Sequence, residues 1–150
     1  MQYDVYIAGS MTGRKVSDVL FERAETKAML TAYGLTYYDP AEDEDLEKLD
    51  HNSTISNAFD VERMRKYVSK DLAAVAECRS VLNITGDMAS DGTGWEMAYA
   101  VYYRHIPVIL VAPLRTVGSK MSFTNILVDG IYANRADAIV AVAEAIKENA

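Results

Sequence analysis

The sequence predicts an α/β protein with a mostly parallel sheet and helices on both faces of that sheet. Short β-rich runs alternate with helical patterns along the chain, and two of these runs, residues 80–86 and 107–113, are typical of buried strands. Strands joined through helices make right-handed crossovers and pair in parallel. Ligands of such sheets bind beyond the carboxyl ends of the strands. With 150 residues, of which 50% are hydrophobic, the chain is expected to form a single domain.

The first half of the chain predicts a strand, a helix and a second strand. "YDVYIAG", residues 3–9, is rich in β-forming residues and breaks at its final glycine. The helical pattern that follows continues to Gly34 and places one set of apolar residues on a single face: Leu20, Phe21, Ala24 and Ala28. "LTYYDP", residues 35–40, predicts a short strand that Pro40 ends. The acidic and polar residues 41–57 are expected to form an excursion or a mobile loop.

The second half of the chain continues this alternation. A helical pattern leads to two buried strands that bracket another helix, and a weaker strand precedes a last helix. In order, these elements are a helix at 59–78, the strand "SVLNITG" at 80–86, a helix at 95–103, the strand "PVILVAP" at 107–113, the strand "GIYAN" at 130–134 and a helix at 135–148. The sheet is therefore expected to have five strands.

Composition excludes several classes of protein. No uncharged apolar run approaches the roughly 18 residues of a membrane span, and the N-terminal residues do not resemble a signal peptide, so a cytoplasmic protein is expected. Cys78 is the single cysteine, and His51 and His105 are far apart, so we expect no internal disulfide and no metal site. The net charge of -7 argues against a nucleic-acid polymer as partner but permits one small anionic ligand.

Three segments follow the carboxyl ends of predicted strands and are expected to converge on one crevice. They are "GSMTGR" at 9–14, "GDMASDGTGWE" at 86–96 and "PLRTVGSKMSFTN" at 113–125. The first matches neither a P-loop nor G-x-G-x-x-G, and an ordinary strand-to-helix turn explains it equally well. If it binds an anion, backbone N–H groups and one guanidinium would come from Gly9, Ser10, Gly13 and Arg14.

Asp71 interrupts the apolar face of the helix predicted at 59–78. At helical spacing this face consists of Val61, Met64, Val68, Leu72, Val75 and Cys78. A lone buried carboxylate is costly unless a partner binds it. Asp71 is therefore expected either to meet a structural partner or to line a site, and the sequence favours neither. Cys78 is interpreted as a core residue and not as a nucleophile.

Glu96 is the only charged residue of "WEMAYAVYY", residues 95–103. One explanation is structural, because Thr93 and Glu96 have the spacing of a capping box at a helix N-terminus. The other is functional, since Asp71 is a second inward carboxylate and the small residues 92–94 let a ligand approach the backbone. Two carboxylates at a strand-end crevice suit chemistry at a glycosidic bond.

The motifs "VYIAGSM" at 5–11, "KDLAAVAEC" at 70–78 and "DGTGWEMAYA" at 91–100 resemble those of the nucleoside 2-deoxyribosyltransferase superfamily. This resemblance implies a flavodoxin-like, Rossmann-like three-layer sandwich with a mostly parallel five-stranded sheet. It also implies a homo-oligomer, a dimer or larger, whose active sites are shared between subunits. The tyrosine-rich residues 99–103 are a candidate interface. The implied partners are a nucleoside or nucleotide and a free nucleobase, with neither cofactor nor metal.

By position in these motifs, the resemblance implies that Glu96 attacks C1′ of a deoxyribosyl group and forms a covalent glycosyl-enzyme. Asp71 would hold the sugar or manage the proton, and Tyr6 would lie near the glutamate. A free base or water would then accept the sugar with net retention. Asn125 resembles an asparagine that a neighbouring subunit supplies to the 5′ end of the sugar. The other implied substrate-binding residues near the glutamate are Asp91, Gly92 and Gly94.

One departure from the transferase pattern leaves the substrate open. Ser90 stands six residues before Glu96, where the transferases commonly have an aspartate, and related nucleoside 5′-monophosphate N-glycosidases resemble this chain in having serine there. A 5′-phosphate would then be bound by Ser10, Arg14, Ser90 and Ser122. Asn125 favours a 5′-hydroxyl instead. The sequence thus predicts a transferase, with the N-glycosidase and a non-catalytic nucleotide-binding sensor domain as alternatives.

Overall fold

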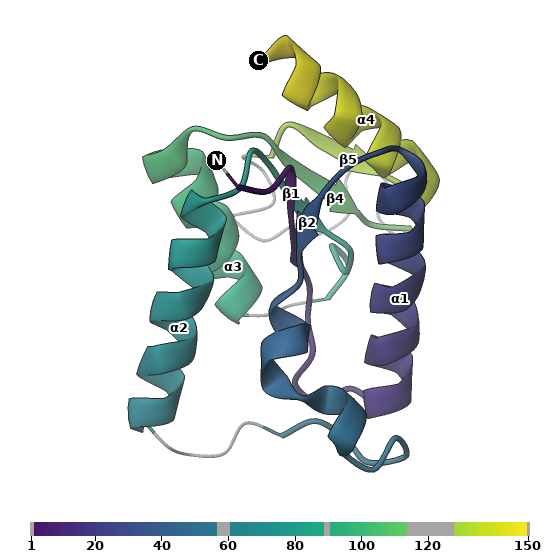
Figure 1. The fold of residues 1–150 in the computed structure, drawn as a ribbon, viewed down its shortest axis with the longest axis vertical. Helices are drawn as coiled ribbons and strands as arrows, with labels where there is room; N and C mark the ends of the chain where they lie inside the picture. Colours follow the sequence, from purple (N-terminus) through teal and green to yellow (C-terminus); the bar gives the residue numbers. More distant parts are fainter. Residues whose placement is uncertain (1, 57–60, 89–90, 114–127, 150) are drawn as a thin grey trace.

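The protein folds around one five-stranded sheet in which every strand is parallel to its neighbours (Figure 1). The computed structural model describes residues 2–56, 61–88, 91–113 and 128–149. The strand order is β2-β1-β3-β4-β5, which is the flavodoxin-like order. This confirms the predicted fold class. The strands are β1 (Val5–Ala8), β2 (Tyr37–Tyr38), β3 (Val81–Asn83), β4 (Val108–Val111) and β5 (Gly130–Tyr132).

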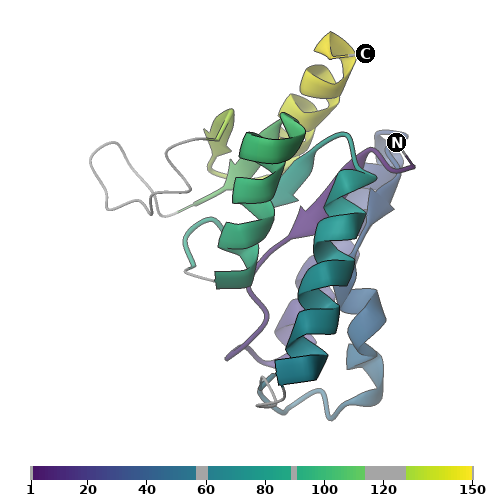
Figure 2. The ribbon, with the colours of Figure 1, turned by 90° about the vertical axis from the view of Figure 1, so that its left-hand side faces the viewer.

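In the described part of the chain, four α-helices cover the two faces of the sheet and make it the middle of three layers (Figures 1 and 2). On one face lie α1 (Val16–Ala32) and α4 (Arg135–Glu148), and on the other lie α2 (Val61–Ala76) and α3 (Asp91–Tyr99). A π-helical turn, η3 (Ala100–Arg104), continues α3. No helix in the described part of the chain is long and apolar enough to cross a membrane.

The alternation of side chains along the strands divides the core between these two faces. On β1, Val5 and Ile7 pack in the cluster that includes residues of α1 and α4, whereas Tyr6 and Ala8 pack in the cluster that includes residues of α2 and α3. All four side chains are fully buried. Strands buried on both faces have continuous apolar sequences, which is why the sequence predicted this sheet correctly.

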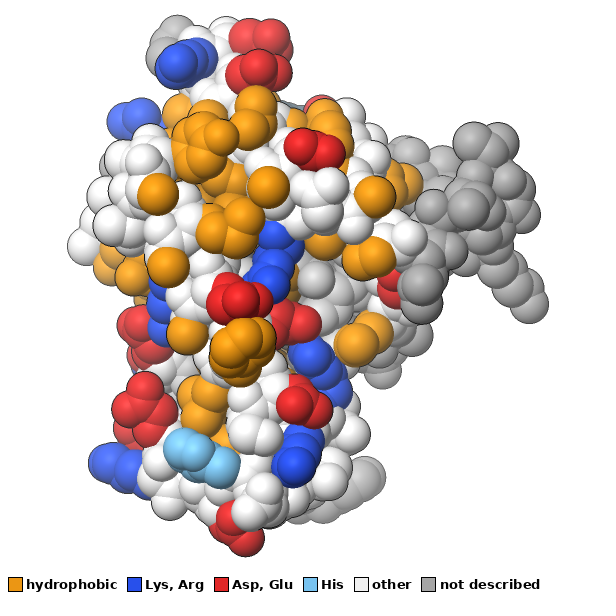
Figure 3. Space-filling model, turned by 90° about the vertical axis from the view of Figure 1, so that its right-hand side faces the viewer, with side chains coloured by type: hydrophobic (Ala, Val, Ile, Leu, Met, Phe, Trp, Pro, Cys, Tyr) orange, Lys and Arg blue, Asp and Glu red, His pale blue; other side chains and the backbone are white. Residues whose placement is uncertain are grey.

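The face of α1 that packs on the sheet differs from the predicted one. Ala24 and Ala28 are exposed, and 65% of the surface of Phe21 is accessible to solvent. Hydrophobic side chains lie among charged ones on the surface of this side of the molecule (Figure 3). The buried side chains are instead Val16, Val19, Arg23, Thr26 and Leu30. Two of these are polar, so a search for an apolar stripe selected the wrong side of the helix.

The predicted apolar face of α2 is only half correct. Val75 and Cys78 are fully buried, but 62% of Val61 and 46% of Val68 are exposed. The side chain of Met64 lies outside the described residues. The C-terminal part of the helix packs against α3 and the sheet, whereas its N-terminal part extends beyond them (Figure 2). The periodicity showed which side faces inward, but not how far along the helix the packing continues.

The acidic region predicted as an excursion is packed against the body of the protein. It contains two short 3₁₀ helices, η1 (Pro40–Glu44) and η2 (Leu46–Lys48). Asp39 caps η1, because its Oδ1 accepts a 3.0 Å hydrogen bond from the Ala41 N–H. Ala41 and Leu46 are buried in a small core that also holds residues of α1. These contacts fix η1 beside the carboxyl end of β1.

Candidate active site

The candidate site lies at the carboxyl ends of β1 and β3. The chain leaves β1 for α1 on one face of the sheet and leaves β3 for α3 on the other, so these two strand ends form the switch point at which open α/β sheets bind ligands. The segments after the two strands meet, because the Ser10 N–H donates a 2.7 Å hydrogen bond to Thr85 Oγ1. Thr85 directly precedes the predicted segment 86–96, and the convergence of the three segments on one crevice stays a prediction. Most of the third segment, 113–125, lies outside the described residues.

Three elements bring the predicted catalytic side chains together here. Tyr6 is on β1, Asp71 is on α2 and Glu96 is on α3, and the charges of the two carboxylates act on the Tyr6 phenol. Tyr6 is fully buried and its ring stacks on that of Tyr38, with 5.8 Å between ring centroids. Its hydroxyl has no partner at strict hydrogen-bond geometry, but it lies close enough to Glu96 for a longer hydrogen bond to stabilise that carboxylate.

Glu96 is a weak acid in this environment. Burial, and then the negative charge of Asp71, raise the pKa of Glu96 to about 8. The hydrogen bond from Tyr6 and the positive charge of Arg23 lower it, and Glu44 raises it further. The carboxyl group therefore holds its proton near neutral pH, as acids and bases in functional sites often do.

Asp71 is also weakened as an acid, but less strongly. Burial, and then the charges of Glu44 and Asp43, raise the pKa of Asp71 to about 6, whereas Lys70 and Arg23 lower it. Glu44 and Asp43 belong to η1, and Lys70 Nζ lies 3.1 Å from Asp43 Oδ1. The acidic segment, which was predicted only as an excursion or a mobile loop, thus contributes negative charge at one edge of the site.

The start of α3 excludes the capping-box explanation of Glu96. The helix begins at Asp91, so Thr93 is its third residue and not its N-cap, and Glu96 lies a further turn into the helix. The small residues 92–94 accordingly form the first turn of the helix and not a loop. A side chain at Gly92 would have no atom within 4 Å, so open space adjoins the backbone at this point.

The predicted anion-binding residues have partners within the protein. The two terminal nitrogens of Arg14 lie 2.9 and 3.1 Å from the carboxylate oxygens of Glu22, and Arg14 also donates to the Ser10 carbonyl. Ser10 is itself buried. At Gly9, a Cβ atom would lie 3.1 to 3.3 Å from three neighbouring side chains, so Gly9 permits close packing. Ser90, Ser122, Asn125 and the side chain of Asp91 lie outside the described residues; Gly94 is half-buried on α3.

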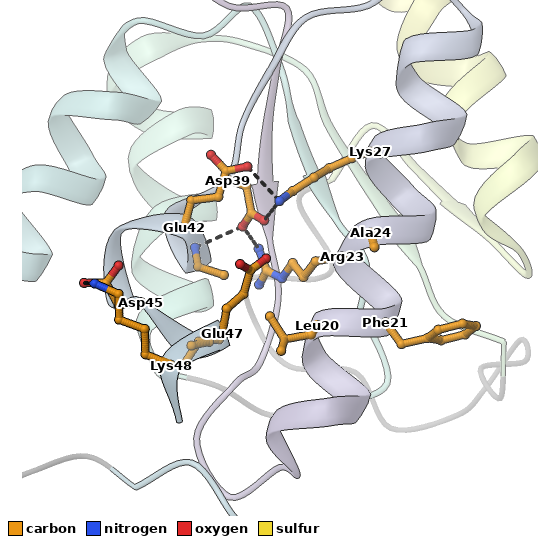
Figure 4. A pocket seen from close by; sticks show the side chains of 12 residues that line it. Leu20, Phe21, Arg23, Ala24, Lys27, Asp39, Glu42, Asp45, Glu47 and Lys48 are labelled. Atoms are coloured by element: carbon orange, nitrogen blue, oxygen red, sulfur yellow. Dashed lines mark hydrogen bonds and ion pairs between the residues drawn. The ribbon is translucent and has the colours of Figure 1, made fainter. Parts of the chain in front are cut away.

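Sequence reasoning missed a buried ion pair at the carboxyl end of β1. Arg23 and Asp39 are 2% and 3% exposed, with 2.9 Å between Arg23 Nη1 and Asp39 Oδ1. Arg23 also donates to the carbonyl oxygens of Ile7, at 2.8 Å, and Gly9, at 3.0 Å. Lys27 Nζ lies 2.9 Å from the other Asp39 oxygen (Figure 4). Two features of the sequence could have revealed this pair. Asp39 stands at the end of a predicted strand, and Arg23 lies at helical spacing from the apolar residues Val16, Val19 and Leu30.

A hollow of about 700 Å³ lies between α1 and the segment that holds η1 and η2 (Figure 4). Arg23 and Asp39 lie at its inner wall, where Figure 4 shows them directed toward each other. Other lining residues are Leu20, Phe21, Lys27 and Leu46. Glu96, Asp71 and Tyr6 do not line this hollow, so it is separate from the candidate site. Among the described residues, no group of His, Cys, Asp or Glu could hold a metal ion.

Fold and site together define a flavodoxin-like α/β protein with a half-buried pair of carboxyl residues at the switch point of its sheet. The chain belongs to the family described as "Domain of unknown function (DUF4406)", whose model matches residues 3–109. A comparison with curated proteins finds no match.

Two solved structures are similar in fold. One is a 2-deoxyribosyltransferase from the psychrotolerant bacterium Bacillus psychrosaccharolyticus, with a TM-score of 0.62 and 21% identity over 89% of this chain and 88% of that one. The other is a conserved protein from Enterococcus faecalis V583, with a TM-score of 0.62 and 14% identity over 100% of both chains. Both likenesses agree with the predicted flavodoxin-like fold.

Proposed function

We propose that this protein is a nucleoside 2-deoxyribosyltransferase that cleaves the N-glycosidic bond of 2′-deoxynucleosides. The observation that carries the proposal is the position of Glu96, a half-buried carboxyl group on α3 beside Tyr6 and Asp71 at the switch point of the sheet. The Glu96 carboxylate attacks C1′, the bond from C1′ to the base nitrogen breaks with its electron pair going to the base, and a glycosyl ester forms. A second base displaces Glu96 from C1′ and restores the original configuration.

The order in which the two carboxyls ionise favours one of the two roles considered for Asp71. Its pKa is about 6, whereas the pKa of Glu96 is about 8. When Glu96 is ionised and able to attack, Asp71 has therefore already lost its proton. A carboxylate accepts hydrogen bonds, so Asp71 is better suited to hold a sugar hydroxyl than to protonate the leaving base.

The charges near the crevice favour a nucleoside over a 5′-monophosphate. Arg14, the cation expected to bind a phosphate, already forms two hydrogen bonds with Glu22. Asp43 and Glu44 add negative charge at the edge next to Asp71. A phosphate would have to displace Glu22 and approach these carboxylates. For this reason we place transfer between nucleosides ahead of nucleotide hydrolysis.

The test is chromatographic detection of free base released from deoxynucleosides and their 5′-monophosphates, with and without an acceptor base. Glu96→Gln is expected to lower base release by about 1000-fold or more, because an amide is a poor nucleophile. Glu148→Gln, the same change on an exposed turn of α4, is the matched control and keeps the wild-type rate.

The same experiment distinguishes the alternatives. Exchange of bases between nucleosides supports the transferase. Release of base from monophosphates without an acceptor would favour the N-glycosidase. If no substrate releases base, and Glu96→Gln still binds nucleotides as wild type does, the proposal fails and the protein is a nucleotide-binding domain.

A further inference from the structure

Arg23 is the only fully buried cation in the described part of the chain. It reaches from α1 to the carboxyl end of β1, where its guanidinium donates to the Ile7 and Gly9 carbonyls and pairs with Asp39. Removing a charge from water is costly, and a buried ion pair often contributes no more stability than an apolar pair of the same size. Stability alone is therefore a weak explanation for this cation.

The position of Arg23 supplies a second explanation. It is hydrogen-bonded to the backbone on either side of Ala8, two residues beyond Tyr6 on the same strand. Its positive charge favours the ionised forms of Tyr6, Asp71 and Glu96, which lie on three different elements. The other charged or titratable groups acting on these three residues are Asp43, Glu44 and Lys70, and all three lie on η1 or α2.

We infer that Arg23 is a positioning residue of the candidate site: its hydrogen bonds fix the carboxyl end of β1, two residues beyond Tyr6, and its buried positive charge favours the carboxylate form of Glu96. This inference rests on the proposed nucleophilic role of Glu96. Asp39 modulates the effect, because its negative charge offsets part of the positive charge of Arg23. Lys27, at 2.9 Å from Asp39, in turn offsets part of that negative charge.

The ion pair of Arg23 and Asp39 allows a test in which two substitutions move the pKa of Glu96 in opposite directions. Arg23→Met removes the positive charge and is expected to raise the pKa of Glu96 by about 0.5 to 1. Asp39→Asn removes the negative charge, keeps an oxygen that can cap η1, and is expected to lower the pKa of Glu96. Arg23→Lys retains the charge and is expected to stay closer to wild type than Arg23→Met.

The measurement is a titration of the Glu96 side-chain carboxyl by ¹³C NMR, with the signal assigned by its loss in Glu96→Gln. If the substitutions acted only by loosening the packing, water would enter the site in both variants. The pKa of Glu96 would then shift in the same direction in Arg23→Met and in Asp39→Asn. Shifts of the same sign in Arg23→Met and Asp39→Asn, or no shift in Arg23→Met, would overturn the inference. If Arg23→Met does not fold, Asp39→Asn is compared with the double variant Arg23→Met/Asp39→Asn. The double variant must then show the higher pKa.

The titration needs no turnover, so it separates this inference from the proposed function. The pH at which kcat/KM for base release rises should move upward in Arg23→Met and downward in Asp39→Asn, together with the NMR values. If the NMR values move and the kinetic profile does not, Arg23 does not act through Glu96 in the reaction and the inference fails. If wild type releases no base while the NMR values move as expected, the proposed function fails and the electrostatic link from Arg23 to Glu96 stands.

Discussion

Glu96 and Asp71 belong to one candidate site, yet they differ as acids because their surroundings differ. Burial is the largest cause for both, but Glu96 then experiences the charge of Asp71, whereas Asp71 lies near the more exposed carboxylates of η1 and near Lys70. At pH values between about 6 and 8, the pair therefore carries its remaining proton on Glu96. The protein alone does not hold its proposed nucleophile in the fully reactive form at neutral pH.

This charge state predicts a specific pH dependence of base release. Because only the Glu96 carboxylate attacks, kcat/KM is expected to rise about tenfold per pH unit below the pKa of Glu96 and to level off above about 8. Initial rates at low substrate concentration, from pH 5.5 to 9.5, measure this profile. A profile that falls over this range would mean that Glu96 must be protonated, and would contradict its role as nucleophile.

The elements that form the site differ in how much added side-chain volume they can accommodate, as Gly86 and Gly92 show. At Gly86, just beyond β3, a Cβ would lie 2.7 Å from the Val111 carbonyl oxygen, a contact that requires the backbone to move. The Gly86 N–H also donates to that oxygen. Gly92, in the first turn of α3, has open space where a side chain would be. The strand ends are therefore closely packed, whereas the start of α3 is open.

Alanine at these two positions is expected to have opposite effects on stability. Gly86→Ala should lower the free energy of unfolding by about 2 kcal/mol, because β3 and β4 must separate locally. Gly92→Ala should leave stability unchanged or raise it by up to about 1 kcal/mol, because alanine is the better helix former. Urea unfolding measures both values. If Gly92 borders the substrate, Gly92→Ala also lowers kcat/KM for base release while the protein remains folded; unchanged kinetics would place the substrate elsewhere.

At the scale of the whole molecule, large apolar side chains remain exposed on α3 and η3. The exposed fractions are 70% for Trp95, 50% for Tyr102 and 76% for Tyr103, and Tyr99 and Tyr103 stack on each other. Exposed apolar groups that gather on one helix are typical of a surface that meets another protein. This surface lies on the helix that carries Glu96 and on the π-helical turn that continues it, so a neighbouring subunit bound there would lie close to the candidate site.

We therefore predict that the protein forms a dimer or a larger homo-oligomer through α3 and η3. Light scattering coupled to size-exclusion chromatography at micromolar concentration should give at least twice the mass of one chain. The double variant Trp95→Ser/Tyr103→Ser should lower that mass, whereas Phe21→Ser, which removes a similarly exposed aromatic from α1, should not. A wild-type monomer would contradict the expectation of a shared site.

The sequence predicted the sheet and the two carboxylates better than it predicted the faces of the helices. Buried parallel strands produce continuous apolar runs, and an isolated carboxylate in an apolar helix is conspicuous. Arg23 was missed because its partners, the carbonyls at the end of β1 and Asp39, are distant in sequence and become its partners only in the fold. The packing of residues 41–57 was missed for a similar reason, since its few apolar residues lie among many acidic ones.

Because its pKa is raised, protonated Glu96 is the form that favours the folded state, whereas the proposed reaction requires the carboxylate. A carboxyl whose pKa is higher in the folded state than in the unfolded chain binds its proton more tightly when folded. This contribution to stability is fully present below the ordinary glutamate pKa of 4.5 and is lost as the pH rises through about 8. The protein should thus be less resistant to unfolding under the alkaline conditions in which Glu96 is most reactive. A bound deoxyribosyl group, which neutralises Glu96 as an ester, would remove that cost.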